Sequence, residues 1–366
     1  WRFYQQHRSG MRALLRMTVR TAVAIGLVEL AVQAVDGTKL RANANPDATM
    51  TPEQLARLAE QTEAAIAELE AQNQGDDPPP PELPPDLQDT RDLQQRITAA
   101  RAAETEDRPP AINRTDPEAR WMKTRQGRQP AYNAQLVVTP ADPEVGGGPG
   151  RIVLAAAVTT QANDVGLLEP MVRAAQVPHQ PIPITLADAG YSSAASLQAA
   201  DAAGIPVIAP VQRQTQQHAP YASEQFRYEP DTDPYRCPEG TLLSRHSRTQ
   251  DRGQPVTRYR ADGAVCQACV AFGHGAASQQ GRQLKTRDDT VRRGADAAQM
   301  ETTEANALRA QRKGLIEPVF GIIKEPMGAR RTQLRGRANV EAEWVLTATA
   351  FNLRTLARAW ASRSVA

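Results

Sequence analysis

The sequence predicts an α/β fold in which a mixed sheet with an antiparallel edge is flanked by helices. Short apolar runs alternate with helical patterns, in the order of three early strands, then helix, strand, helix and strand. An Asp that is followed by a Gly within two residues comes just after two of these predicted strands. The 366 residues exceed the needs of one small core, so we expect two domains or one large domain with an insertion.

The composition excludes several protein classes. With 43 Lys and Arg against 41 Asp and Glu, the net charge of +2 identifies no partner. Three cysteines exclude a disulfide scaffold and suit a reducing compartment. The apolar run over residues 21–35 falls short of the ~20 residues of a membrane-spanning helix. Because the sequence begins at Trp1, directly in an Arg-rich stretch with helical spacing, we expect an upstream segment to be missing.

The first predicted elements place an aspartate at a strand end. Residues 11–25 have helical spacing and stop at Gly26. A buried strand follows over about residues 30–35 and leads into Asp36 and Gly37. We therefore expect Asp36 to stand at the carboxyl end of this strand.

Residues 51–105 are predicted to form an acidic helical hairpin inserted into the fold. Thr51 and Gln54 form a capping box, residues 75–85 are a Pro-rich connector, and a second helix covers about residues 87–103. Residues 51–90 hold ten acids against one Arg, a surface that repels phosphate. We favour a solvated structural role for this hairpin.

The remaining core elements follow up to residue 209. Asp188 comes just after a predicted strand, in the sequence Asp188-Ala-Gly190, and Asp164 is predicted to cap a helix that begins near Val165. The predicted strands cover residues 131–138, 151–159, 181–186 and 205–209, with a Gly-rich hairpin loop over 140–150 and a helix over 193–203.

The last third of the chain divides into an irregular part and a helical part. Regular patterns fade after Val211 and return near Ala305. Residues 305–337 carry eight Lys and Arg against two acids, and a terminal helix over 339–361 buries aromatic and aliphatic residues.

Three acids stand out as candidate metal ligands, namely Asp36, Asp188 and Glu317. Carboxylates placed near buried strand ends supply the hard oxygen ligands that Mg²⁺ prefers. Two such ions can stabilise the attacking and leaving oxygens of a phosphoryl displacement. The cations around Glu317 would hold a polyanion nearby. The alternative is turn formation, since Asp before Gly is common turn chemistry.

The cysteines have the spacing of a metal knuckle. Cys266 and Cys269 form a CxxC pair, Cys237 is a candidate third ligand and His274 a candidate fourth, which together would hold a structural zinc ion. The alternative is reduced thiols that are buried or face solvent.

Several separated motifs occur in an order that resembles bacterial insertion-sequence transposases of the DDE class, which have a ribonuclease-H-like catalytic core. Many motifs in one order are more specific than any single motif. They are Val35-Asp-Gly-Thr-Lys39, Thr115-Asp-Pro-Glu-Ala-Arg120, Tyr132-Asn-Ala-Gln135, Leu186-Ala-Asp-Ala-Gly-Tyr191, Tyr235-Arg-Cys-Pro238 and Ile316-Glu-Pro-Val-Phe-Gly-Ile-Ile-Lys324.

This resemblance implies roles for individual residues. Asp36, Asp188 and Glu317 would bind two Mg²⁺ or Mn²⁺ ions. Lys324 lies seven residues after Glu317 as in the family, whereas Lys313 replaces its Arg and Ala310 its Tyr. From the residues themselves, Pro318 predicts a local kink. The predicted DNA contacts are Lys39, Lys313, Lys324, Arg330 and Arg331.

The resemblance also implies an activity, partners and an organisation. We expect metal-dependent cleavage at transposon ends and transfer of the 3′-hydroxyl into target DNA, in a homodimer on double-stranded DNA, chromosome-associated in a bacterial cytoplasm and away from membranes. The alternatives are an inactive DNA-binding remnant and a ribonuclease-H-like nuclease without strand transfer. The expected parts are a helical segment 1–30 left from a truncated DNA-binding region, a core 31–212 with hairpin 51–105, a Cys-containing insert 213–300 and C-terminal helices 301–366.

Overall fold

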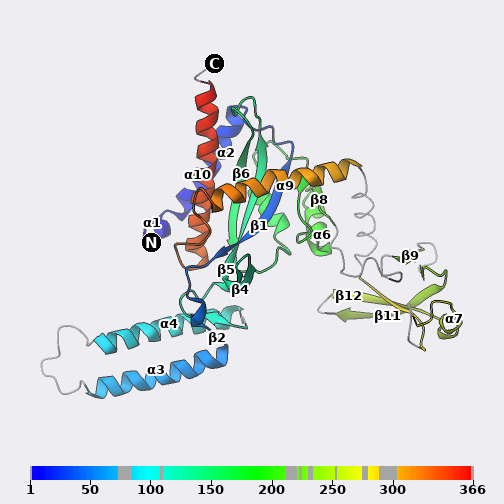
Figure 1. The fold of residues 1–366 in the computed structure, drawn as a ribbon, viewed down its shortest axis with the longest axis horizontal. Helices are drawn as coiled ribbons and strands as arrows, with labels where there is room; N and C mark the ends of the chain where they lie inside the picture. Colours follow the sequence, from blue (N-terminus) through cyan, green and yellow to red (C-terminus); the bar gives the residue numbers. More distant parts are fainter. Residues whose placement is uncertain are drawn as a thin grey trace.

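The chain folds into a mixed sheet flanked by helices, a helical pair and a second, smaller sheet (Figure 1). The predicted α/β class is confirmed. This computed structural model describes residues 2–72, 85–107, 110–210, 221, 225–229, 234–251, 254–273, 279–287 and 303–363.

The secondary-structure elements have the following bounds. The helices are α1 Arg2–Gln6, α2 Arg8–Ala24, η1 Pro46–Ala48, α3 Pro52–Gln72, α4 Pro85–Asp107, α5 Leu168–Ala174, α6 Ala194–Ala202, α7 Gly263–Gln267, α9 Thr303–Lys324 and α10 Arg337–Arg363. The strands are β1 Gln33–Arg41, β2 Thr49–Met50, β3 Ile112–Asn113, β4 Arg120–Thr124, β5 Gly127–Ala141, β6 Gly150–Thr159, β7 Thr185–Leu186, β8 Val207–Ile208, β9 Arg227–Tyr228, β10 Tyr235–Arg236, β11 Leu242–Asp251, β12 Gln254–Ala261 and β13 Gln283–Arg287.

The larger sheet is antiparallel on one side and parallel on the other. Its order is β4-β5-β1-β7-β8, and β6 also pairs with β5. Strand β5 is long, so β4 pairs with residues 127–131 and β6 with residues 133–141. Strand β1 is antiparallel to β5 but parallel to β7, and β7 is parallel to β8. Strand β1 therefore lies where the two pairing modes meet.

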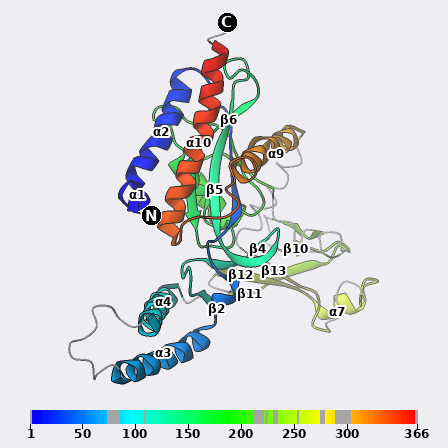
Figure 2. The ribbon, with the colours of Figure 1, turned by 60° about the vertical axis from the view of Figure 1, so that its left-hand side comes forward.

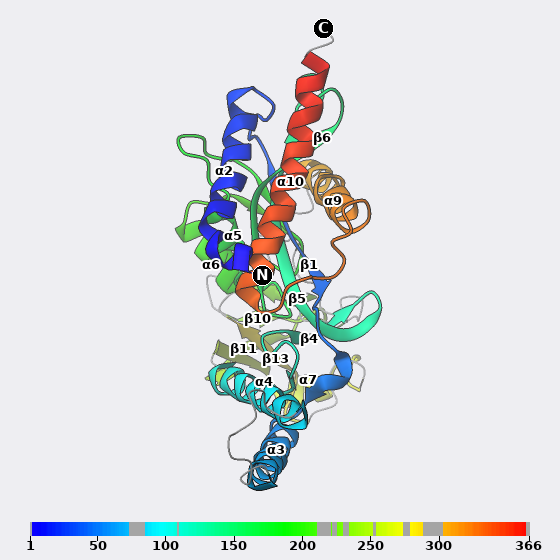
Figure 3. The ribbon, with the colours of Figure 1, turned by 90° about the vertical axis from the view of Figure 1, so that its left-hand side faces the viewer.

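Helices cover both faces of this sheet (Figure 3). Because side chains alternate along a strand, Ala34 and Leu40 of β1 pack in one core with α9 and the first part of α10. Val35 packs on the other face, in a second core with α5 and α6. Helices α2 and α10 lie side by side along the sheet (Figure 2). Even-numbered residues of β1 therefore face α9, and odd-numbered residues face α5 and α6.

The predicted helical hairpin is present as the pair α3 and α4 (Figure 1). The capping box is confirmed, since Gln54 N donates to Thr51 Oγ1 at 3.3 Å and Thr51 N donates to Gln54 Oε1 at 2.9 Å. The pair has its own small core, made of Leu55, Ala59, Ile97, Ala100 and Ile112. Residues 75–84 of the predicted connector lie outside the described residues.

Strand β1 differs from its prediction. It begins at Gln33 and continues past Asp36 and Gly37 to Arg41. The Asp-Gly pair is therefore not a strand exit, because β5 pairs with β1 through Arg41 and holds it extended. Asp36 does lie beyond the parallel pairing with β7, which covers only Gln33 and Ala34.

The expectation of an irregular region after Val211 is wrong. Strands β9 to β13 form an antiparallel sheet in the order β13-β12-β11-β10-β9. Most of its apolar residues pack in one cluster, around Tyr235, Leu243, Tyr259 and Leu284. These residues are few in each strand, so the apolar signal is too sparse to recognise from sequence.

Within the part of the chain that the structure describes, no helix has the length and apolar character that crossing a membrane requires.

Candidate active site

Asp36 and Asp188 occupy equivalent positions on neighbouring chain segments. Ala34 of β1 pairs with Leu186 of β7 in parallel register, and each aspartate follows two residues later. Along β1, Asp36 continues the face of Ala34, because side chains alternate along a strand. Asp188 lies just beyond the end of β7, close enough for its charge to raise the pKa of Asp36. The structure thus brings together two of the three acids that the sequence singled out, although 152 positions separate them in the chain.

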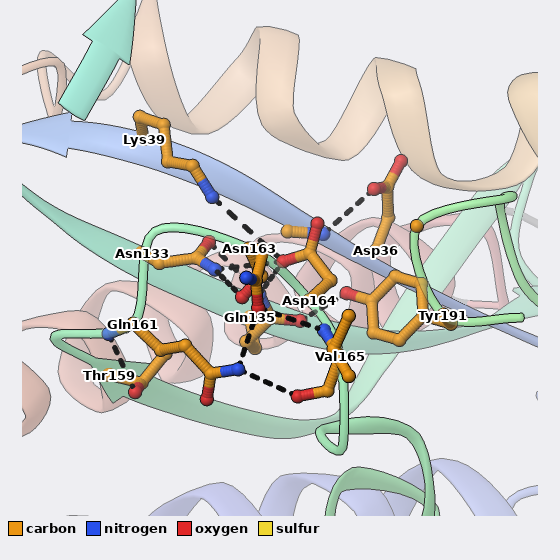
Figure 4. Close-up of polar contacts among 12 residues, drawn as sticks. Asp36, Lys39, Asn133, Gln135, Thr159, Gln161, Asn163, Asp164, Val165 and Tyr191 are labelled. Atoms are coloured by element: carbon orange, nitrogen blue, oxygen red, sulfur yellow. Dashed lines mark hydrogen bonds and ion pairs between the residues drawn. The ribbon is translucent and has the colours of Figure 1, made fainter. Parts of the chain in front are cut away.

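Asp36 lies in a polar but poorly hydrated position. Its Oδ1 accepts a hydrogen bond from Gly37 N at 2.8 Å, and its Oδ2 contacts Arg312 Nη1 of α9 at 2.8 Å. The pKa of the Asp36 carboxyl is raised to about 6, chiefly by burial; Arg312 opposes this rise, and nearby Asp188 contributes to it. Figure 4 shows the Asp36 carboxylate pointing toward the helix above β1.

The turn after β7 fixes Asp188. Gly190 N donates to Asp188 Oδ1 at 2.6 Å. A Cβ at Gly190 would lie 2.9 Å from that oxygen and 3.3 Å from Asp164 Oδ2. The glycine therefore leaves room for both carboxylates at this turn.

Asp164 is not the helix cap that the sequence predicts. Helix α5 begins at Leu168, and its N-cap residue Leu167 makes no side-chain cap bond. Asp164 Oδ1 instead accepts from Asn133 Nδ2 and Gln135 Nε2, both at 2.8 Å (Figure 4). Two charge-assisted bonds from the sheet outweigh one cap bond to a helix that starts three residues further on.

This amide network lies on the opposite face of β1 from Asp36. Gly37 pairs with Gln135 and Lys39 with Asn133, so these four residues share the face toward α5 and α6. Lys39 Nζ lies 3.9 Å from Asp164 Oδ1, and burial lowers the pKa of the Lys39 ammonium. Lys39, a predicted DNA contact, is therefore engaged by a carboxylate in this structure.

Glu317 lies on α9 with its side chain exposed. Lys324, seven residues on, shares that side of the helix, and its ammonium donates to Thr38 of β1. Among the described residues, Glu317 makes no hydrogen bond or ion pair with either aspartate. Nor do three or more His, Cys, Asp or Glu side chains in this part of the chain form a group that could hold a metal ion.

Pro318 sits inside α9 without ending it. Proline has no N–H, so the carbonyl of Gly314 loses its partner within the helix. Arg151 of β6 replaces that donor, with Nη2 at 2.5 Å from Gly314 O. The sheet thereby satisfies the one carbonyl that the proline leaves free.

The other predicted DNA contacts are more dispersed. Lys313 is exposed on α9. Arg330 pairs with Glu325, and Arg331 Nη2 donates to Asn43 Oδ1 at 2.9 Å. These cations lie outside the Asp36 cluster, and a role in binding DNA stays a prediction.

The Asp36 and Asp188 carboxylates fit a divalent cation by their chemistry. They are hard oxygen donors, and Mg²⁺ is commonly held by one or two carboxylates together with substrate phosphates. The Asp188 carboxylate raises the pKa of Asp36 because the two negative charges repel each other, and a bound cation would offset this repulsion. Their chemistry fits the pair as ligands, and Glu317 as the third ligand stays a prediction.

Cys266 lies in α7, whereas Cys237 directly follows β10 and Cys269 lies two residues after α7. All three are free thiols; Thr241 N donates to Cys237 Sγ at 3.3 Å and Arg282 N to Cys266 Sγ at 3.4 Å. Backbone N–H groups directed at sulfur suit a buried thiol and a metal-bound thiolate equally. His274 lies outside the described residues, so zinc binding stays a prediction.

Sequence reasoning missed Arg312 and the amide pair Asn133 and Gln135. Arg312 shares a helical face with Ile316, which is buried, and this spacing of four was a usable signal. No local pattern marks Gln135, because its partner Asp164 is 29 residues away in the chain.

The comparisons with known proteins agree with the resemblance in the sequence. The model of the family described as "Transposase DDE domain" matches residues 236–357, which include Glu317 and Lys324. This match supports a DDE transposase, and hence an enzyme that acts on DNA. No curated protein and no solved structure matches the chain.

Proposed function

We propose that this protein is a DDE transposase that cleaves DNA at transposon ends and joins the freed 3′-hydroxyl to target DNA. The observation that carries the proposal is the proximity of Asp36 and Asp188, each two residues beyond the paired residues Ala34 and Leu186, in a chain whose residues 236–357 match a transposase DDE domain. The sheet order supports a ribonuclease-H-like core, since three antiparallel strands β6, β5 and β1 continue into the parallel strands β7 and β8.

The chain's own residues would act as follows. Asp36 and Asp188 would hold Mg²⁺ or Mn²⁺, and Glu317 would complete the ligand set after α9 moves toward β1. Bound divalent cations would supply positive charge to the scissile phosphate. Lys324, held near β1 through Thr38, would contact a phosphate beside the cleaved bond.

Arg312 has a definite place in this scheme. Its guanidinium balances the Asp36 charge in the structure described here. A cation bound by Asp36 would take over this role, so Arg312 would be released to a DNA phosphate. Arginine suits this exchange because carboxylate and phosphate both accept its forked hydrogen bonds.

A nicking assay on supercoiled plasmid tests the proposal. The intact chain with Mg²⁺ or Mn²⁺ should produce nicks that Asp36→Asn and Asp188→Ala abolish. Asp92→Asn is the matched control, because Asp92 is an exposed acid on α4. Absence of metal-dependent nicking by the parent chain would favour a DNA-binding remnant.

A second assay separates transposition from plain nuclease activity. A duplex with a precut 3′-hydroxyl end should become joined to a target plasmid. Cleavage without joining would favour the ribonuclease-H-like nuclease. Glu317→Gln should abolish both steps if Glu317 is the third ligand, and an active Glu317→Gln variant would remove it from the site.

A further inference from the structure

One face of the small sheet carries a group of cations that the proposed function has not used. This group, the cationic face, consists of Arg227, Arg236, Arg258, Arg260 and Lys285. They come from strands β9, β10, β12 and β13. Arg227 and Lys285 are exposed, and the other three are half-buried.

The strand register places these five side chains on the same side. Residues that pair directly across antiparallel strands point to one face, and every second residue along a strand does so too. Arg227 pairs with Arg236, and Arg258 pairs with Lys285. Arg260 lies two residues after Arg258 on the same strand and pairs with Ser244 of β11. Two residues before Ser244, Leu242 pairs with Arg236, so Arg236 points to the same side as well.

The opposite face of the same sheet carries its apolar cluster. Tyr235, Leu243, Tyr259 and Leu284 alternate with the cations and pack with Cys266 of α7. Ring centroids of Tyr235 and Tyr259 are 4.8 Å apart. The aromatic and aliphatic side chains of this cluster therefore lie on the side away from the cationic face.

The arrangement of the cationic face is unfavourable for the sheet alone. Arg227 opposite Arg236 and Arg258 opposite Lys285 are like-charge cross-strand pairs, which destabilise a sheet. Glu229 offsets one of them, through Arg236 Nε at 2.7 Å. Among the described residues, no ion pair involves Arg227, Arg258 or Lys285. The Nε of Arg258 is buried and has no acceptor in this part of the chain.

A bound polyanion would remove this repulsion, and the neighbouring residues suit phosphate. Ser244 and Gln283 are exposed on the same face, and such side chains donate hydrogen bonds to phosphate oxygens. The described residues of this face include no aromatic ring, since the tyrosines pack on the other side. Single-strand binding relies on stacking bases on aromatic rings, so this face fits an intact duplex better.

We propose that the cationic face binds the phosphate backbone of double-stranded DNA, as a docking surface separate from the candidate active site. The proposal rests on the proposed function for its choice of DNA as the polyanion. It names a surface other than the five cations that the sequence predicted as DNA contacts.

Fluorescence anisotropy with a labelled duplex of about 30 base pairs tests this proposal. The test variant is the double change Arg258→Gln and Lys285→Gln. The matched control is Arg245→Gln with Arg248→Gln, because these exposed arginines of β11 pair with Tyr259 and Thr257 and so belong to the opposite face. Both variants remove the same charge from the same sheet.

The expected result is a selective loss of duplex binding. Two lost phosphate contacts should reduce the slope of log affinity against log salt by about 2, with at least ~10-fold weaker binding at low salt. The control should keep the parent's slope and affinity. Thermal melting should show that the test variant is folded, since the change removes a like-charge pair.

Other outcomes would overturn the proposal. These are an equal loss in both variants, unchanged binding in the test variant, or equally strong competition by single-stranded DNA or RNA. A loss of self-association without loss of duplex binding would assign the face to a second copy's acidic hairpin. Asp188→Ala separates this proposal from the proposed function, since that variant should bind duplex normally even where nicking is absent.

Discussion

Arg312 on α9 and Asp36 on β1 form an ion pair whose atoms lie 2.8 Å apart, with only 12% and 17% of the two side chains exposed. Further along the same helix, Lys324 donates to Thr38 of the same strand. Asp36 and Thr38 are two residues apart and face the same way. Polar contacts, as well as the apolar core, therefore hold α9 against β1.

The Arg312–Asp36 pair should show strong energetic coupling. A double-mutant cycle with Arg312→Gln and Asp36→Asn should give a coupling free energy of about 1 to 3 kcal/mol, because the pair is mostly shielded from water. Chemical denaturation of the four proteins measures it. The exposed pair Arg91 and Glu70 is the control and should couple by less than about 1 kcal/mol. Equal coupling in both pairs would contradict the geometry.

Asp116 should make stability depend on pH. This fully buried carboxyl accepts from Tyr132 Oη at 2.7 Å and Gly336 N at 3.1 Å, and burial raises its pKa to about 6. The folded state then binds more protons than the unfolded state, so the free energy of unfolding should fall as pH rises from about 4 to 6.

The variant Asp116→Asn should lose this contribution to the pH slope, which amounts to about 2 to 3 kcal/mol over that range. Asp36 contributes in the same direction and remains in both proteins. Denaturation at several pH values measures the difference, with Asp47→Asn, an exposed acid, as the control. If the free energy of unfolding varied with pH in the same way for the unmodified protein and for Asp116→Asn, this would contradict the raised pKa of Asp116.

Gly37 should not accept a side chain. A Cβ there would lie 2.2 Å from Gln135 Nε2 and 2.8 Å from Asp164 Oδ1. Gly37→Ala should therefore destabilise the protein by about 1 to 3 kcal/mol, as overpacking does. Gly10→Ala is the control, since nothing lies within 4 Å of its added Cβ in α2, and it should stabilise by about 0.5 to 1 kcal/mol. Thermal or chemical unfolding measures both changes.

Replacing Lys324 and replacing Lys313 should affect different steps, the first the nicking rate and the second DNA binding, although both lysines are predicted DNA contacts. Lys324→Gln should slow nicking by at least ~10-fold, because it removes a charge that is held against β1 by Thr38, two residues from Asp36 in the chain. Lys313→Gln removes an exposed charge and should mainly weaken DNA binding, with a salt slope lower by about 1. Nicking rates at saturating DNA separate the two effects, and equal rates would refute the distinction.

The sequence predicts those parts of the fold that local patterns encode. The capping box predicts helix α3, and the glycine after Asp188 together with the strand before it predicts the turn there. The extent of β1 could not be predicted, because pairing with β5 decides it and that partner lies about a hundred residues away. The small sheet was missed since each of its strands holds few apolar residues.

In the candidate site, too, local patterns predict some residues, and long-range contacts determine others. Asp36 and Asp188 were recognisable because each follows a buried apolar run. Asp164 has the local chemistry of a cap, and only the long-range contact with Gln135 reveals its different place. Glu317 was singled out by the cations around it and then by the resemblance, whereas its position relative to the aspartates depends on how α9 docks, which local sequence does not encode.

The bond from Arg151 to the Gly314 carbonyl limits how α9 can rearrange. It anchors the helix to β6 only three residues before Glu317. This contact ties the turn of α9 just before Glu317 to β6. A movement of Glu317 relative to Asp36 would therefore either keep the contact, by turning α9 about Gly314, or break it and leave the Gly314 carbonyl without its donor.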